Sequence, residues 1–264
     1  MQPTPLVAIR DVSLTYGHGE DGVLAVQNLT LDIAKGDFVA VVGPSGCGKS
    51  SLMKLVTGLV PPTTGEIRVA GEKVTRPIRG VGMAFQNSTL MPWRTTLDNI
   101  MLPFEIVEPH KRRLRAEKAK YVAQAEQLLA TVGLSNFGKK FPWELSGGMQ
   151  QRANLCRALV HQPELLMLDE PFGALDAFTR EELWAVMQNL WLQKHFTAVL
   201  VTHDLREAVY LSDTVYVISH RPGRVIYKAK VDLPRPRTLE TTFDAKFIDI
   251  VHRLRARISH ELNT

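Results

Sequence analysis

One segment limits the possible folds more than any other: an apolar run, DFVAVVG at 37–43, leads into the loop GPSGCGKS and then into KSSLMKLVTGL. The apolar run predicts a buried strand, and the residues after the loop predict a helix. The loop matches G-x-x-x-x-G-K-S, and a preceding strand with a following helix is the setting in which that pattern is specific. An ordinary glycine-rich turn is a poor alternative, and we predict a phosphate-binding loop in an α/β domain.

The sequence of the phosphate-binding loop predicts which residues contact the nucleotide phosphates and Mg²⁺. Its backbone amides are expected to converge on phosphate oxygens, Lys49 to reach the β- and γ-phosphates, and the Ser50 hydroxyl to hold Mg²⁺. Cys47 lies near a helix N-terminus and Lys49, which is expected to favour its thiolate form. The residues predicted to line the nucleotide phosphates are Gly43, Pro44, Ser45, Gly46, Cys47, Gly48, Lys49, Ser50 and Ser51.

Two carboxylates end the apolar run LLMLDE at 165–170. The carboxyl end of a buried strand in a doubly wound sheet lies at the ligand-binding edge, so Asp169 suits Mg²⁺ coordination and Glu170 suits activation of the attacking water. In the alternative, Pro171 begins a helix whose N-terminus the acids cap. That alternative does not account for two acids at the end of a buried strand, and we favour the catalytic interpretation.

The other elements indicate an α/β core with an insertion. Residues 6–16 and 23–33 alternate apolar and β-branched residues and predict antiparallel strands. Helical periodicity dominates from about 89 to 160. Further strands are predicted at 66–71, 80–86, 197–202 and 214–219. We therefore predict a parallel α/β core joined to antiparallel strands and interrupted by a helical insert.

The helical insert contains a second phosphate-facing pattern, LSGGMQQR at 145–152. Ser146, Gly147 and Gly148 bring backbone amides to the start of a helix, which is a favourable place for an anion. Three single residues are weaker candidates. His203 and Gln86 each end a predicted strand, where they could contact phosphate, and Tyr16 could stack on a base or pack under the first hairpin.

In this order, Tyr16, GPSGCGKS, Gln86, LSGGMQQR, LLMLDEP, GALD and His203 make the chain resemble the ATPase subunits of ABC transporters over about residues 6 to 230. The resemblance implies a P-loop ABC ATPase fold with a RecA-like core, an antiparallel β subdomain and a helical insert. It implies ATP and Mg²⁺ as cofactors, with Ser50, Gln86 and Asp169 as metal ligands.

The same resemblance implies roles for single residues. Catalysis would fall to Glu170 as the base, His203 as the switch histidine, and Gln86 and Lys49, while Tyr16 would contact the nucleotide. The D-loop would lie around Asp176. The sequence departs from the family at Met149, where glutamine is usual, which puts contacts of that fifth signature side chain in doubt.

In this family two subunits enclose two ATP molecules, each between one subunit's phosphate loop and its partner's signature. The resemblance therefore implies a homodimer in which LSGGMQQR serves the neighbour's nucleotide, much as an arginine finger acts in trans. It also implies integral membrane permease subunits and, indirectly, an extracytoplasmic solute-binding protein.

Two further segments, SHRPGR (219–224) and VDLPRPR (231–237), resemble the importer branch for nitrate, sulfonates and taurine. We therefore expect an ATP-hydrolysing subunit that drives uptake of a small anion. The resemblance suggests that residues 86–100 dock a permease helix through Met91, Pro92 and Trp93, although Trp93 could instead pack within the domain.

Composition adds limits. The net charge is +5, and the basic run 109–120 favours a solvated helix face over a nucleic-acid site, so no nucleic acid is expected. No window approaches the roughly 20 apolar residues of a membrane span. The N-terminal segment predicts no secretory signal, and two cysteines fit a reducing compartment. We expect a peripheral protein at the cytoplasmic face of the inner membrane.

The competing function is a soluble ABC-type ATPase that acts on nucleic acid or ribosomes. Such relatives usually carry long coiled coils or two fused ATPase domains, and this chain shows neither. We expect an ATPase domain over 1–230, with the helical insert within it, and a C-terminal segment over 231–264. In that segment Phe243, Phe247, Val251, Leu254 and Ile258 follow a helical spacing. This spacing favours packing on the chain's own domain, and a regulatory or partner helix is the alternative.

Overall fold

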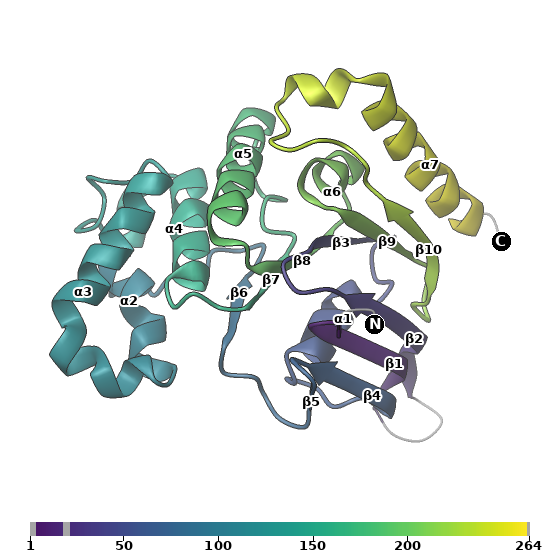
Figure 1. Cartoon of the computed structure of the whole chain (residues 1–264), viewed down its shortest axis with the longest axis horizontal. Helices are drawn as coiled ribbons and strands as arrows, with labels where there is room; N and C mark the ends of the chain where they lie inside the picture. The colour runs from purple at the N-terminus through teal and green to yellow at the C-terminus, as the bar shows by residue number, and fades with distance from the viewer. Residues whose placement is uncertain (1–3, 18–21, 263–264) are drawn as a thin grey trace. The chain divides into compact units, whose positions relative to one another are not determined.

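The computed structural model describes residues 4–17 and 22–262. The N-terminal segment, for which no secretory signal is expected, begins with residues 1–3, and these lie outside the described residues. The chain divides into two compact units, described separately below. Unit 1 comprises residues 1–78 with 197–264, and unit 2 comprises residues 79–196. Figure 1 gives the element labels.

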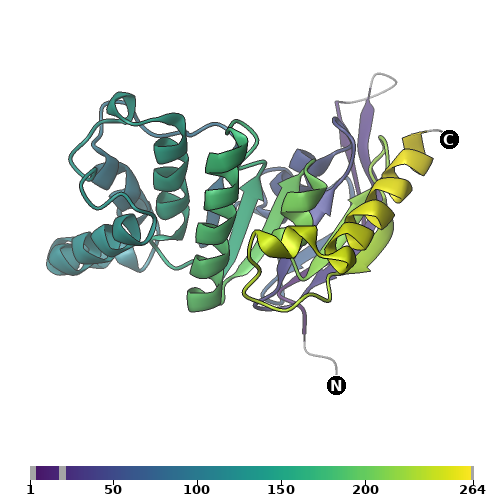
Figure 2. The ribbon, with the colours of Figure 1, turned by 90° about the horizontal axis from the view of Figure 1, so that it is seen from above.

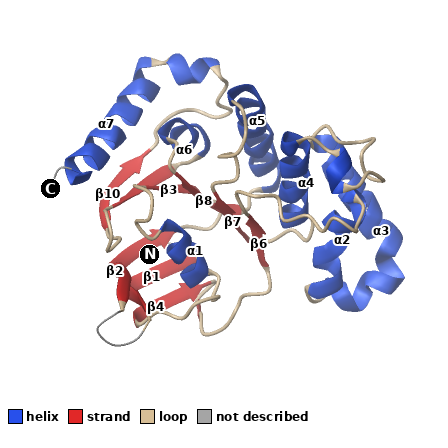
Figure 3. Ribbon diagram, turned by 180° about the vertical axis from the view of Figure 1, so that it is seen from behind, coloured by secondary structure: helices blue, strands red, loops and turns tan. Residues whose placement is uncertain are grey.

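Unit 1 contains an antiparallel sheet of order β2-β1-β4-β5 with helix α1 beside it (Figures 1 and 3). A register shift between Ile9 and Val12 of β1, with Asp11 at φ 46°, lets both apolar residues face the interior. The bounds are β1 (Val7–Tyr16), β2 (Val23–Ile33), α1 (Lys49–Val56), β4 (Thr64–Val69) and β5 (Glu72–Lys73).

Unit 1 also contains four strands in the order β10-β9-β3-β8. Strand β3 is parallel to both β8 and β9, and every one of its residues is buried, which explains its uninterrupted apolar sequence. Helix α6 contacts β3 and β8, and helix α7 contacts α6, β9 and β10. Helix α7 is the yellow helix in Figure 2. The bounds are β3 (Phe38–Val42), β8 (Thr197–Thr202), α6 (Leu205–Leu211), β9 (Thr214–Ile218), β10 (Val225–Lys230), η3 (Glu240–Phe243) and α7 (Ala245–Leu262).

Unit 2 pairs β6 with β7 in parallel and carries four helices and a short 3₁₀ segment. Helices α2, α3 and α4 contact one another, and α4 also contacts β6 and α5. The bounds are β6 (Val81–Ala84), α2 (Thr96–Ile106), α3 (His110–Thr131), η2 (Pro142–Glu144), α4 (Gly147–Leu159), β7 (Leu165–Asp169) and α5 (Ala177–Lys194).

The predicted strands and the predicted helical character of the insert agree with these elements. Strands β5 and β10 were not predicted, because β5 is only two residues long and β10 (VIYKAK) mixes apolar residues with lysines. Within the described part of the chain, no helix is both long and apolar enough to cross a membrane. In α7, Phe247, Ile250 and Leu254 are buried as a stripe, whereas Phe243 precedes the helix and is 69% exposed.

Candidate functional site

The phosphate loop joins β3 to α1 in unit 1. Lys49, the first residue of α1, is buried, and its Nζ atom donates to the carbonyl oxygens of Gly43 (2.9 Å) and Pro44 (2.8 Å). The ammonium group therefore lies within the curve of the loop. Gly48 adopts φ 100°, and a β-carbon there would stand 2.8 Å from the carbonyl oxygen of Ala25. Strand β2 thus supports the loop where it turns into the helix.

The segment SHRPGR supports the same loop from another direction. Gly223 donates its N–H to the carbonyl of Ala25 (2.9 Å) and accepts from the N–H of Gln27 (3.0 Å), and a β-carbon on Gly223 would overlap the carbonyl oxygen of Cys47. The Ser219 hydroxyl accepts from the N–H of Arg224 (2.9 Å) and holds the turn closed. This segment is therefore a tight support under the phosphate loop.

We expect Gly223→Ala to weaken ATP binding at least about tenfold, because the added methyl group must displace the Cys47 peptide of the phosphate loop. Loss of one loop hydrogen bond to a charged phosphate costs about 1.5–3 kcal/mol, which is tenfold or more in affinity. Titration calorimetry with ATP measures the affinity. Gly80→Ala is the control, since a β-carbon at Gly80 would meet nothing within 4 Å. Equal affinities for the Gly223 variant and the unmodified protein would contradict the supporting role.

Cys47 does not have the environment expected for a reactive thiolate. Its side chain is only 1% exposed, and burial raises the pKa of the thiol despite the nearby Lys49 ammonium. The prediction of thiolate character is therefore wrong, because desolvation outweighs the positive charge. Cys156 on α4 is fully buried, and burial raises its pKa to about 12, as expected for a core residue.

Tyr16 and His203 both lie close to elements of the phosphate loop in unit 1. The Tyr16 hydroxyl donates to Ser51 Oγ on α1 (3.2 Å), and Lys54 Nζ lies 5.9 Å from the centre of the half-buried Tyr16 ring. Val42 is paired with Thr202, so the exposed His203 follows β8 at the edge where Gly43 follows β3. The structure therefore gathers Tyr16, residues 43–51 and His203 in one unit.

In unit 2 Asp169 is the last residue of strand β7 and Glu170 directly follows it, as the sequence predicts. Glu170 adopts φ 44°, a left-handed backbone conformation that is uncommon for a residue with a side chain, and its carbonyl accepts from the N–H of Gly173 (3.1 Å). The next helix begins only at Ala177, capped by Asp176, so the two acids do not cap a helix that starts at Pro171. Their positions at a sharp turn fit a role toward a ligand.

The signature begins helix α4. Ser146 is the N-cap, and its Oγ accepts from the N–H of Met149 (3.3 Å), so the fifth signature position contributes a backbone group here. Gly147 is exposed with open space around its α-carbon, and a β-carbon at Gly148 would stand 2.6 Å from Thr179 in the first turn of α5. Bare amides at a helix N-terminus favour an anion.

Polar side chains of α4 hold the segment that carries Gln86. Gln151 Nε2 donates to the carbonyls of Phe85 (3.0 Å) and Pro171, and Arg157 donates to the carbonyl of Thr89 (2.8 Å). The Ser88 hydroxyl donates to Gln150 Oε1 (2.8 Å). These contacts were not predicted from the sequence, although Gln150, Gln151, Asn154 and Arg157 place polar side chains on successive turns of α4.

A cavity of about 110 Å³ within unit 2 is lined by residues 86–88, Gly147, Gln150, Gln151, Pro171, Ala174 and Leu175. Gln86 Nε2 lies 3.4 Å from where a β-carbon on Gly173 would be. The structure therefore gathers Gln86, the signature and the turn after Glu170. Hydroxyl, carboxylate and amide oxygens, as offered by Ser50, Asp169 and Gln86, are the ligand types that Mg²⁺ prefers, so the residues suit the metal.

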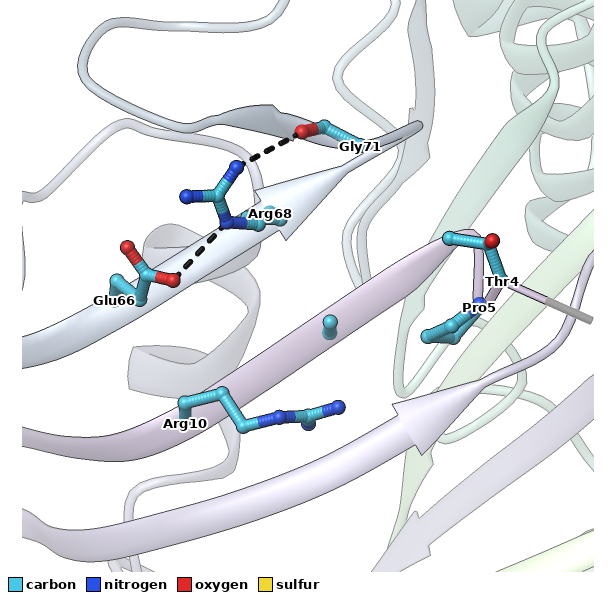
Figure 4. A pocket seen from close by; sticks show the side chains of 7 residues that line it. Thr4, Pro5, Arg10, Glu66, Arg68 and Gly71 are labelled. Atoms are coloured by element: carbon cyan, nitrogen blue, oxygen red, sulfur yellow. Dashed lines mark hydrogen bonds and ion pairs between the residues drawn. The ribbon is translucent and has the colours of Figure 1, made fainter. Parts of the chain in front are cut away.

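A different hollow, of about 260 Å³, lies on the antiparallel sheet of unit 1 (Figure 4). Arg10 pairs there with Asp32 (2.7 Å), and Arg68 pairs with Glu66 (3.0 Å) and donates to the carbonyl of Gly71. Both arginines are about half exposed and already paired with carboxylates. Because carboxylates already neutralise these two arginines, the hollow is a poor site for an anion.

The ABC transporter family profile matches residues 26–173, and the chain belongs to this family of ATPases. The α/β structure is a P-loop ABC ATPase fold. The chain is 42% identical over 233 residues to the aliphatic sulfonates import ATP-binding protein SsuB of Bacillus cereus, covering 88% of each chain. It is 40% identical to an ATP-binding protein of Brucella abortus (strain 2308), covering 97% of this chain and 95% of the relative.

A solved structure of the same kind is the dimeric post-hydrolysis state of an ATP-binding cassette bound to ADP and Pi. It matches with a TM-score of 0.71 and 30% sequence identity, covering 86% of this chain and 100% of the other. A dimeric bacterial ABC transporter cassette matches with a TM-score of 0.72 at 30% identity and the same coverage.

Proposed function

We propose that this chain is the ATP-hydrolysing subunit of an importer for aliphatic sulfonates, working as a homodimer with a separate membrane permease. The observation that carries the proposal is the presence of two phosphate-facing helix starts in one chain, the loop around Lys49 and the Ser146-capped start of α4. The similarity to a sulfonate-import ATP-binding protein supports the substrate class.

Within each nucleotide site the residues have separate roles. The loop amides and Lys49 would bind the β- and γ-phosphates, and the Ser50 hydroxyl, Asp169 and Gln86 would supply oxygen ligands to Mg²⁺. Mg²⁺, when bound, neutralises charge on the phosphate oxygens. Glu170 accepts a proton from the attacking water, His203 contacts the γ-phosphate, and Tyr16 contacts the base.

The signature acts on the nucleotide of the second copy. Ser146, Gly147 and Gly148 present amides and the positive end of the α4 dipole to an anion, and Gly147 is exposed with open space around it. The dimeric cassettes in the comparison support this arrangement. The dimer, rather than the single chain, is then the complete enzyme.

The loop before α2 suits the permease contact. Trp93 is 73% exposed, so the alternative in which it packs within the domain is wrong. The buried Asn99 accepts from the N–H of Met91 (2.7 Å) and donates to the carbonyls of Met91 and Arg94, which holds the loop in shape. An exposed indole on an ordered loop is a favourable anchor for a partner helix. We propose that this contact holds the subunit at the cytoplasmic face of the membrane.

The proposed division of the chain has two parts. We propose an ATPase domain over 1–230, with the helical insert 89–160, followed by a segment 231–264. The similarity to the Brucella abortus relative extends over nearly the whole chain, whereas the family profile ends at 173. The import-subunit relatives favour transport over an action on nucleic acid or ribosomes.

A growth experiment tests this function. Deletion of the gene should abolish growth on butanesulfonate as the only sulfur source and leave growth on sulfate unchanged. A plasmid with the unmodified gene should restore growth, and one with Glu170→Gln should not. Parallel cultures on taurine and on nitrate measure the breadth of the substrate class. Full growth of the deletion strain on butanesulfonate would contradict sulfonate import.

A further inference from the structure

The segment that follows β10 forms hydrogen bonds with the short helix α6 in unit 1. We call residues 231–243 the strap; it contains VDLPRPR and leads into α7 (Figures 1 and 2). Helix α6 has only seven residues, about 10 Å in length, and helices of this size are not stable alone. Both of its ends therefore need partners elsewhere in the fold.

Two arginines of the strap donate hydrogen bonds to the last carbonyl groups of α6. Arg237 Nη1 donates to the carbonyls of Val209 (2.8 Å), Tyr210 (3.0 Å) and Ser212 (2.7 Å). Arg235 Nη2 donates to the carbonyl of Leu211 (2.6 Å). Terminal helix carbonyls otherwise lack partners, and they form the negative end of the helix dipole, so two guanidinium groups satisfy both needs.

Arg237 is buried to an unusual degree for a charged side chain, with only 2% of it exposed. Burial lowers its pKa to about 10, which still leaves it charged at neutral pH. A buried charge is costly unless it is fully hydrogen-bonded. The Tyr210 hydroxyl closes the arrangement by donating to the carbonyl of Arg237 (2.7 Å). The strap and the C-terminal end of α6 are therefore joined by hydrogen bonds in both directions.

The opposite end of α6 carries His203. Asp204 is the N-cap, its Oδ1 accepting from the N–H groups of Arg206 (2.8 Å) and Glu207 (3.2 Å), and His203 directly precedes it. A second strap contact lies along the helix, where Arg206 donates to Thr242 Oγ1 (3.0 Å). A shift of the C-terminal end of α6 would therefore move the histidine.

We propose that the strap is a positioning device for His203, with Arg237 as its central positioning residue; this rests on the proposed function of His203. The strap fixes α6 from the end remote from the nucleotide. Loss of Arg237 lets α6 shift, so that His203 leaves the position from which it acts on the γ-phosphate. ATP binding, which depends on the separate loop at 43–51, remains.

The direct test observes His203 in the full chain. In protein labelled with ¹³C-histidine, the imidazole resonance of His203 is assigned by its loss in His203→Gln. We expect this resonance to move in Arg237→Gln, to return toward its original position in Arg237→Lys, and to stay in place in Arg253→Gln. The last variant removes an exposed α7 arginine paired with Asp249 and is the matched control.

The kinetic test uses the dimer with its membrane subunits. Arg237→Gln should lower kcat about tenfold, within the loss that a misplacement near 1 Å causes, with nucleotide affinity changed less than about twofold. In the His203→Gln background the same change should cause no further loss, because both act through one group. An equal tenfold loss in both backgrounds would overturn the proposal.

If circular dichroism shows that Arg237→Gln does not fold, a second variant tests the strap in its place. Thr242→Val removes the contact with Arg206 and keeps the side-chain shape. It should move the His203 resonance in the same direction by a smaller amount. An unmoved resonance in the folded strap variants would overturn the proposal. If His203→Gln itself leaves kcat unchanged, the proposed role of His203 fails, while the resonance still tests the strap.

Discussion

Glu170→Gln is expected to lower ATP turnover at least about 10²-fold, the usual loss when a general base is removed. The amide has the shape of the carboxylate but cannot accept a proton from the attacking water. Glu170 is held at φ 44° at the end of β7, so its side chain is directed by a backbone that the substitution leaves in place. Phosphate release at saturating Mg-ATP measures the turnover.

Nucleotide binding should survive the Glu170 substitution, because the phosphate contacts come from residues 43–51. The ATP-bound dimer should therefore accumulate, and size-exclusion chromatography with ATP should show it. Glu126→Gln, which changes an exposed glutamate on α3, is the control for loss of one negative charge. Turnover by Glu170→Gln close to that of the unmodified protein would exclude Glu170 as the base.

The second large effect concerns which chain the signature serves. One chain carries Lys49→Ala, which removes the main side-chain charge on the β- and γ-phosphates. The other carries Gly147→Asp, which places a carboxylate at the exposed start of α4, where it should repel a γ-phosphate. If the signature acts in trans, this heterodimer keeps one intact site and has one site with both defects.

The reciprocal heterodimer places both substitutions in one chain and pairs it with an unmodified chain. Trans action then leaves one defect in each site, so activity should collapse. Action within one chain predicts the reverse order of the two rates. Differently tagged chains allow the heterodimers to be purified, with the membrane subunits present to hold the pair together. A faster rate for the doubly substituted pairing than for the split pairing would reject action in trans.

Local features of this protein could be predicted from its sequence. The phosphate loop works through consecutive backbone amides between a strand and a helix, so GPSGCGKS carries its structural setting with it. The same holds for Ser146 at the start of α4 and for two acids at the end of β7, because capping and strand ends depend on neighbouring residues.

Contacts between distant segments could not be predicted in this way. The strained backbone of Glu170, the burial that raises the pKa of Cys47 and the exposure of Trp93 depend on what packs nearby. Cys47 illustrates the point, because its sequence neighbours favour a thiolate while its surroundings in space oppose one. Sequence spacing contains no information about desolvation.

The two proline- and arginine-containing segments near the C-terminus show most clearly what the sequence reveals and what only the folded structure reveals. By itself, the sequence determined only that SHRPGR and VDLPRPR resemble segments of the importer branch. Only the tertiary structure decided that Gly223 lies against the Cys47 carbonyl and that Arg237 binds the end of α6. The physical reason is that a missing side chain and a buried guanidinium act through packing and hydrogen bonds to backbone groups. Those groups have no residue-specific signature, and they come together only when the chain folds.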